Sequence, residues 1–153
     1  MATSIKKGLT AKQLLYMARV FWKKTASLSL VKISSFSKKV DKKTGNLQIT
    51  CTTYSLKDGN GVSKRPRDIK RHKTSVSSQT GPGGKVSTGP IKVSCSCESF
   101  LYHCEYKLWK NYGAADLIYG NGKPIVKGPT ADVKMAACKH LVTVVETILK
   151  KGL

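Results

Sequence analysis

Two short stretches decide how this chain folds: Cys95-Ser96-Cys97 and Cys138-Lys139-His140. Each stretch holds two potential metal ligands that are separated by one residue, and 40 residues lie between the two stretches. Together they supply three thiolates and one imidazole, a ligand set that suits a structural zinc ion in tetrahedral coordination. A shared ion would therefore bring two distant parts of the chain to one point.

The local sequence around each pair indicates how its ligands are held. Cys95 and Cys97 have the i, i+2 spacing of a strand, so both sulfur atoms can leave the same face. Cys138 and His140 introduce a periodic apolar run, so they are expected where a helix begins. The free N–H groups and positive dipole end of a helix favour a thiolate at that position. A single Cys-x-Cys pair is better explained as small core residues, but the matched pairs favour one structural Zn²⁺.

These residues resemble a SWIM-type zinc finger, a ββα module. The resemblance covers roughly residues 91–151, and the segment between the two pairs is longer than in most members of the family. It implies a role in binding DNA or protein rather than in catalysis. The phrases Gly113-Ala114-Ala115-Asp116, Gly120-Asn121-Gly122 and Cys138-Lys139-His140-Leu141 also resemble SWIM proteins of tailed bacteriophages, which implies a structural protein of a virion.

The charge of the chain is extreme and unevenly distributed. Twenty-eight basic and eight acidic residues give a net charge of +20. Residues 1–92 hold 20 basic and 3 acidic residues, a net charge of +17, whereas residues 93–153 carry only +3. Because self-repulsion on this scale disfavours an isolated compact protein, we expect an anionic partner for the N-terminal part.

Cysteine usage and hydropathy indicate where the protein is made. No apolar run reaches membrane-spanning length, and the first residues lack the apolar core of a secretory signal. Five cysteines with Cys-x-Cys spacing argue for metal binding rather than disulfides. We expect a protein that is made in the cytoplasm, is not secreted by a signal peptide and has no membrane partner.

Hydrophobic periodicity predicts an α+β fold with a small antiparallel sheet, an N-terminal helix and a ββα-like zinc knuckle that carries a helical and hairpin insertion. Helices are expected at 11–24 (with Thr10 as N-cap), 99–112 and 137–150; strands are expected at 28–36, 47–55 and 91–98, and a hairpin at 116–126. The composition divides the chain into a basic region (1–73), a Gly/Ser/Pro linker (74–90) and a zinc module (91–153).

Outside the two pairs, Cys104 and His103 could in principle bind metal, whereas Cys51 has no second ligand near it in the sequence. Cys51 falls on the apolar face of its predicted strand, and Cys104 lies four residues from both Phe100 and Leu108 in a helical apolar stripe. Both cysteines are therefore predicted to be core residues. His103 lies on a neighbouring helix face and is expected to be exposed.

The most basic segment runs from residue 64 to 73. Its cations are Lys64, Arg65, Arg67, Lys70, Arg71 and Lys73. This density suits phosphate neutralisation and counterion release. The alternatives are a solvated loop or an edge strand that its charges protect. No aromatic residue interleaves with these cations, so base stacking is not indicated.

The motifs favour binding over catalysis. Three Cys and one His close the zinc tetrahedron, whereas a catalytic zinc keeps an open position. No Glu accompanies His140 as a zinc deaminase requires, and no nucleophile motif appears. We expect a non-enzymatic structural or adaptor component of a large nucleic-acid-containing assembly such as a virion, without a small-molecule substrate. Its zinc module would dock on protein, and its basic half would face nucleic acid or acidic neighbours. The alternative is a free DNA- or RNA-binding accessory protein.

Overall fold

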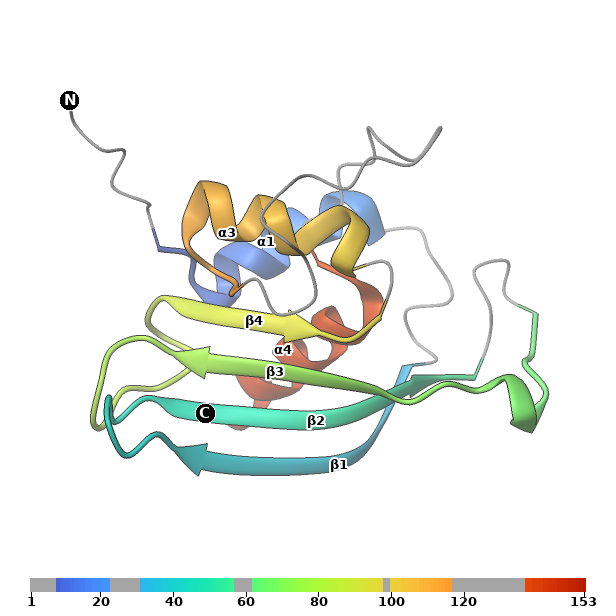
Figure 1. Ribbon diagram of the computed structural model, residues 1–153, viewed down its shortest axis with the longest axis horizontal. Coiled ribbons are helices and arrows are strands. Elements are labelled where there is room, and N and C mark those ends of the chain that lie inside the picture. Colours follow the sequence, from blue (N-terminus) through green and yellow to red (C-terminus); the bar gives the residue numbers. More distant parts are fainter. Residues whose placement is uncertain (1–7, 23–30, 57–61, 98–99, 117–136) are drawn as a thin grey trace.

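The computed structural model describes residues 8–22, 31–56, 62–97, 100–116 and 137–153. Four antiparallel strands form one open sheet in the order β1-β2-β3-β4, which is also their order along the chain (Figure 1). The strands are β1 (Val31–Val40), β2 (Leu47–Ser55), β3 (His72–Ser78) and β4 (Ile91–Cys95). The helices are α1 (Ala11–Trp22), α3 (Tyr106–Tyr112) and α4 (Lys139–Lys151), with a π-helical turn (Leu101–Glu105) before α3 and a short 3₁₀ helix (Pro66–Asp68) before β3. The α+β fold class predicted from the sequence is confirmed.

The described helices cover one face of the sheet only. α4 packs against all four strands, and α1 packs on α4. In Figure 1 α4 lies behind the sheet, with α1 and α3 above β4, and the near face of the sheet carries none of these helices. Alternation along the strands explains this asymmetry, since in β2 Ile49, Cys51 and Thr53 are buried while Gln48 is exposed. One face of the sheet is therefore part of the core and the other faces solvent.

The core forms where the apolar stripe of α4 meets the inward residues of the sheet. Its fully buried members include Ile49, Val76, Ile91, Leu14, Phe100, Leu108, Leu141, Val144 and Ile148. They come from both the basic region and the zinc module that were predicted from the sequence. The two parts thus share one sheet and one core.

Local sequence signals set the ends of the helices. At the start of α1 the hydroxyl of Thr10 accepts a hydrogen bond from the Gln13 N–H (3.2 Å), and Gln13 Oε1 accepts one from the Thr10 N–H (2.9 Å). This reciprocal capping box confirms Thr10 as the N-cap. Gly113 and Gly152 end α3 and α4 in the left-handed conformation, which glycine adopts readily.

Two strand predictions were wrong at their boundaries. β1 extends to Val40, beyond the predicted end at residue 36, because Lys38 and Lys39 pair with β2 up to the turn. Lysines are common on such edge strands, and β1 is an edge strand with a bulge between Ile33 and Ser35. β4 ends at Cys95 rather than at residue 98. The last helix begins at Lys139, two residues later than predicted.

The predicted linker at 74–90 is wrong for residues 74–78, which form most of β3. Their small polar residues suggested a linker, but Thr74, Val76 and Ser78 alternate inward and are fully or almost fully buried. Residues 79–90 connect β3 to β4, and Val86 in this connection is buried and donates its N–H to the Leu153 carbonyl (2.9 Å). The predicted hairpin at 116–126 lies outside the described residues apart from Asp116.

The turn between β1 and β2 contacts the connection between β3 and β4. Asn46 Oδ1 accepts a hydrogen bond from the Gly81 N–H (2.8 Å). Gly45 has φ +76°, and a Cβ atom there would lie 2.5 Å from Pro82 Cγ and 2.8 Å from Pro82 N. Glycine is thus required at position 45 both by its backbone conformation and by the close approach of Pro82.

We predict that Gly45→Ala lowers the free energy of unfolding by about 3 kcal/mol, since a left-handed conformation costs 1–2 kcal/mol for alanine and the overlap with Pro82 adds a steric cost. Gly83→Ala is the matched control, because Gly83 has φ +78° but no atom within 4 Å of its added Cβ. Urea unfolding measures both. Equal destabilisation by the two variants would contradict the close approach at Gly45.

Candidate metal centre

The four residues singled out in the sequence meet at one point. Cys95 ends β4 and Cys97 follows two residues later, while Cys138 is the N-cap of α4 and His140 lies in its first turn. All four are buried, with at most 5% of their surface exposed. Their ligand atoms all lie within 4.8 Å of one another. The structure therefore forms a compact Cys₃His cluster that could hold one metal ion.

The spacing of the donor atoms fits a small tetrahedral ion. Metal–sulfur bonds of about 2.3 Å and metal–nitrogen bonds of about 2.1 Å place tetrahedral ligands about 3.5 to 3.8 Å apart. Cys95 Sγ lies 3.9 Å from His140 Nδ1. Backbone groups also fix two of the four residues, since the Phe100 N–H donates to Cys97 Sγ (3.4 Å) and the Val142 N–H to the Cys138 carbonyl (3.0 Å).

Hydrogen bonds and burial within the cluster shift the pKa values of its three cysteines in different directions. Bonds from the Cys138 and Cys97 thiols lower the pKa of Cys95 far below its usual value. The bond with Cys138 lowers the pKa of Cys97, but its bond to Cys95 and its burial outweigh this and raise the value to about 12. Burial raises the pKa of Cys138. The three thiols thus differ in how readily each loses its proton, and a cation bound to them would favour their deprotonated forms.

A chain of buried hydroxyl groups supports Cys95 from the neighbouring strand. The register of β3 and β4 pairs Thr74 with Cys95, and the Thr74 hydroxyl donates to Cys95 Sγ (3.4 Å). The Thr53 hydroxyl lies 3.0 Å from that of Thr74 and donates to the His72 carbonyl (3.2 Å). Such bonds orient a metal ligand and tune its charge. Thr74 was assigned to the linker from sequence, and only the strand register reveals its place beside the cluster.

His72 is a second neighbour that the sequence did not single out. It begins β3 on the helix-covered side, and its ring centroid lies 4.7 Å from that of His140. Burial and the proximity of His140 lower the pKa of His72. Ser96, between the two cysteines, places its hydroxyl 3.5 Å from His72 Nδ1 and accepts the Lys73 N–H (3.0 Å). The start of β3 therefore packs directly against the cluster.

The two remaining cysteines belong to the core. Cys51 is fully buried on the inner face of β2, and burial raises its pKa to about 11. Cys104 is buried in the π-helical turn, and burial raises its pKa as well. Both lie within the hydrophobic core, as the apolar patterns predicted. The His103 side chain lies outside the described part of the structure.

The basic segment leads into the sheet. Lys64, Arg65 and Arg67 lie around the short 3₁₀ helix, where Arg65 pairs with Asp68 (3.1 Å). Arg71 stacks over the Tyr54 ring at 4.6 Å, and Lys73 lies exposed in β3. β3 is flanked by β2 and β4, so the edge-strand alternative for this segment is wrong. Lys70 is exposed just before β3.

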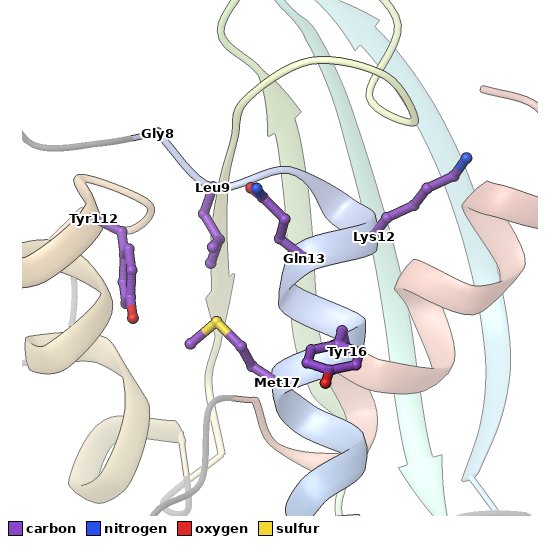
Figure 2. Close-up of a pocket in the computed structure, with 7 residues that line it drawn as sticks. All are labelled: Gly8, Leu9, Lys12, Gln13, Tyr16, Met17 and Tyr112. Carbon is purple, nitrogen blue, oxygen red and sulfur yellow. The ribbon is translucent and has the colours of Figure 1, made fainter.

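A separate hollow of about 420 Å³ lies between α1 and the end of α3 (Figure 2). Leu9, Met17 and Tyr112 line it with apolar surface, and Lys12 and Gln13 stand at its rim. Its described lining includes neither a carboxylate nor an imidazole, the groups that most often act as general acid or base. The hollow is not connected with the Cys₃His cluster by any shared residue.

Comparison with known protein families, curated proteins and solved structures finds no match. The metal-binding interpretation therefore depends on the residues of this chain alone. Within the described residues no helix is both long and apolar enough to cross a bilayer.

We predict that Thr74→Val weakens metal affinity about tenfold, because loss of a bond to a ligand typically costs 10- to 100-fold. Thr52→Val is the control, since Thr52 lies on the other face of the adjacent strand. Competition with a chromophoric zinc chelator measures both affinities. Equal affinity of the two variants would show that the Thr74 hydroxyl does not support Cys95.

Proposed function

We propose that the chain is a non-enzymatic zinc protein that acts as a structural or adaptor component of a large nucleic-acid-containing assembly, of which a virion is the favoured example. Its Cys₃His cluster would be a SWIM-type centre that holds one structural Zn²⁺. The protein would be made in the cytoplasm and incorporated into the particle.

The observation that carries the zinc proposal is the closed and buried ligand set. Four protein ligands satisfy a tetrahedral ion and leave no position for water or substrate. Three thiolates also reduce the Lewis acidity that hydrolysis requires. The cluster joins the end of β4 to the start of α4, so an ion there would stabilise the packing of the last helix on the sheet.

The proposed partner follows from charge. A net charge of +20 is self-repelling, and binding to a polyanion would relieve this repulsion. In the segment from residue 64 to 73 the cations are mostly exposed, and only Arg65 among them makes one of the ion pairs found in the described residues, with Asp68. These features support contact with nucleic acid or with an acidic neighbour in the assembly.

We predict one zinc per chain in freshly purified reduced protein, measured by elemental analysis. Cys138→Ser and His140→Ala should lose the metal and lower the melting temperature by about 10 °C or more, because each removes a ligand on which the packing of α4 depends. Cys51→Ala, a buried cysteine away from the cluster, should retain one zinc. Full zinc content in both ligand variants, or zinc-free native protein, would refute the centre.

We predict that charge reversal at Arg65, Arg67, Lys70 and Arg71 weakens polyanion binding regardless of sequence and flattens its dependence on salt, since each lost phosphate contact reduces the salt slope by about 1. Electrophoretic mobility shift over a series of salt concentrations measures this. An unchanged affinity and slope would locate the contact elsewhere on the protein.

A further inference from the structure

The uncovered face of the sheet has an unusual composition. The register of the strands places on it Lys32, Ser35, Ser37, Lys39, Gln48, Thr50, Thr52, Tyr54, Lys73, Ser75, Ser77, Lys92 and Ser94. We call this set the open face. Serine and threonine hydroxyl groups occupy the centre of this face, and its lysines lie at the border. None of the four strands contributes an acidic residue to it.

The hydroxyl groups form cross-strand contacts over the centre of the open face. The Ser35 hydroxyl donates to Thr52 Oγ1 (2.9 Å), and the Thr50 and Ser75 hydroxyls lie 3.4 Å apart. Ser37 donates to the Thr50 carbonyl (3.3 Å). These side chains are short and held by their neighbours, and Ser75 and Ser94 expose only 8% and 9% of their surface, so the face presents a closely packed polar surface.

The cations at the border are available to a ligand. Lys32, Lys39 and Lys73 are exposed, and the ion pairs found in the described residues do not involve them. Lys92 pairs with Asp116 (3.0 Å), the one described carboxylate at this edge. Strand spacings of about 4.8 Å and rises of about 3.3 Å per residue make the face roughly 14 Å wide and 20 Å long. The positive charges therefore surround a surface large enough for several phosphates.

The residue types on the open face indicate whether its partner is a protein surface, the bases of a nucleic acid or the phosphates of its backbone. A protein partner would need apolar side chains at the centre of the contact, but the centre consists of serine and threonine. The aromatic residue on this face is the half-buried Tyr54, whose ring is stacked with Arg71 at 4.6 Å, so the face offers no platform for successive bases. Lysines and hydroxyl groups are the donors that contact phosphate oxygens in nucleic-acid complexes.

We propose that the open face binds the sugar-phosphate backbone of nucleic acid without sequence preference, with Lys32, Lys39 and Lys73 neutralising phosphates. This proposal rests on the proposed function, because it locates on the sheet the nucleic-acid contact that the charge of the chain suggests. It places the contact on the side of the sheet opposite α4, and the helix-covered side remains available for protein neighbours.

The test uses full-length zinc-loaded protein and a mixed-sequence DNA duplex, with affinity measured by fluorescence anisotropy over a series of salt concentrations. The triple variant Lys32→Gln, Lys39→Gln and Lys73→Gln should reduce the salt slope by about 3. The control triple variant removes the same charge from exposed helix positions, with Lys12→Gln, Lys110→Gln and Lys150→Gln. It should retain the wild-type slope. Zinc content and melting temperature establish that each variant is folded.

A single-residue comparison sharpens the test. Lys38 and Lys39 are adjacent and both exposed, but Lys39 pairs with Gln48 on the open face whereas Lys38 pairs with Ile49 on the helix-covered face. Lys39→Gln should reduce the slope by about 1, and Lys38→Gln should leave it unchanged. If the salt slope falls equally in both members of each matched pair, the open face is not the contact. The proposal that the protein binds nucleic acid would still stand.

Two further outcomes separate the proposals. If zinc-loaded wild-type protein binds poly-glutamate but not the duplex, and the open-face variant loses that binding, the partner is an acidic protein surface and the nucleic-acid assignment is overturned. If the wild type binds neither polyanion, the open face and the polyanion part of the proposed function both fail. The zinc centre is tested independently by its metal content.

Discussion

The convergence of β4 and α4 on the Cys₃His cluster is the constraint on which the rest of the structure depends. Thr74 and His72 of β3 pack against it, and α4, which begins at its ligands, covers the inner face of all four strands. The open face exists because this helix occupies only one side of the sheet. A metal site at this junction would link strand pairing to helix packing, so the two layers would gain or lose stability together.

The ligand set and the ends of the helices could be predicted from sequence because their signals are local. Cys95 and Cys97 lie two residues apart at the end of β4, Thr10 and Gln13 form a capping box, and Gly113 and Gly152 end their helices. The places of Thr74 and His72 beside the cluster could not be predicted. Both depend on the register between β3 and β4 or on packing across the sheet, which residues near in sequence do not encode.

Residues 74–78 were predicted to be part of a linker because they are rich in serine and threonine. The same small hydroxyl residues make up the centre of the open face. Small hydroxyl residues suit a linker, but they also suit a strand whose outer side is polar and whose inner side hydrogen-bonds to a buried cysteine. Thr74 and Ser75 are adjacent and lie on opposite faces: Thr74 donates to Cys95 Sγ, whereas the Ser75 hydroxyl lies beside that of Thr50 on the open face and is 8% exposed. Composition alone does not separate these cases, because the difference lies in the hydrogen-bond partners supplied by β2 and β4.

The bulge and the lysines of β1 oppose pairing between the edge strands of two molecules. An unpaired edge of ten residues would ordinarily invite the same edge of a second molecule, and continuous intermolecular sheets would follow at high concentration. The irregularity between Ile33 and Ser35 interrupts the regular row of backbone groups, and Lys32, Lys38 and Lys39 would meet their own counterparts. Many copies of the chain can therefore lie close together without joining through this edge.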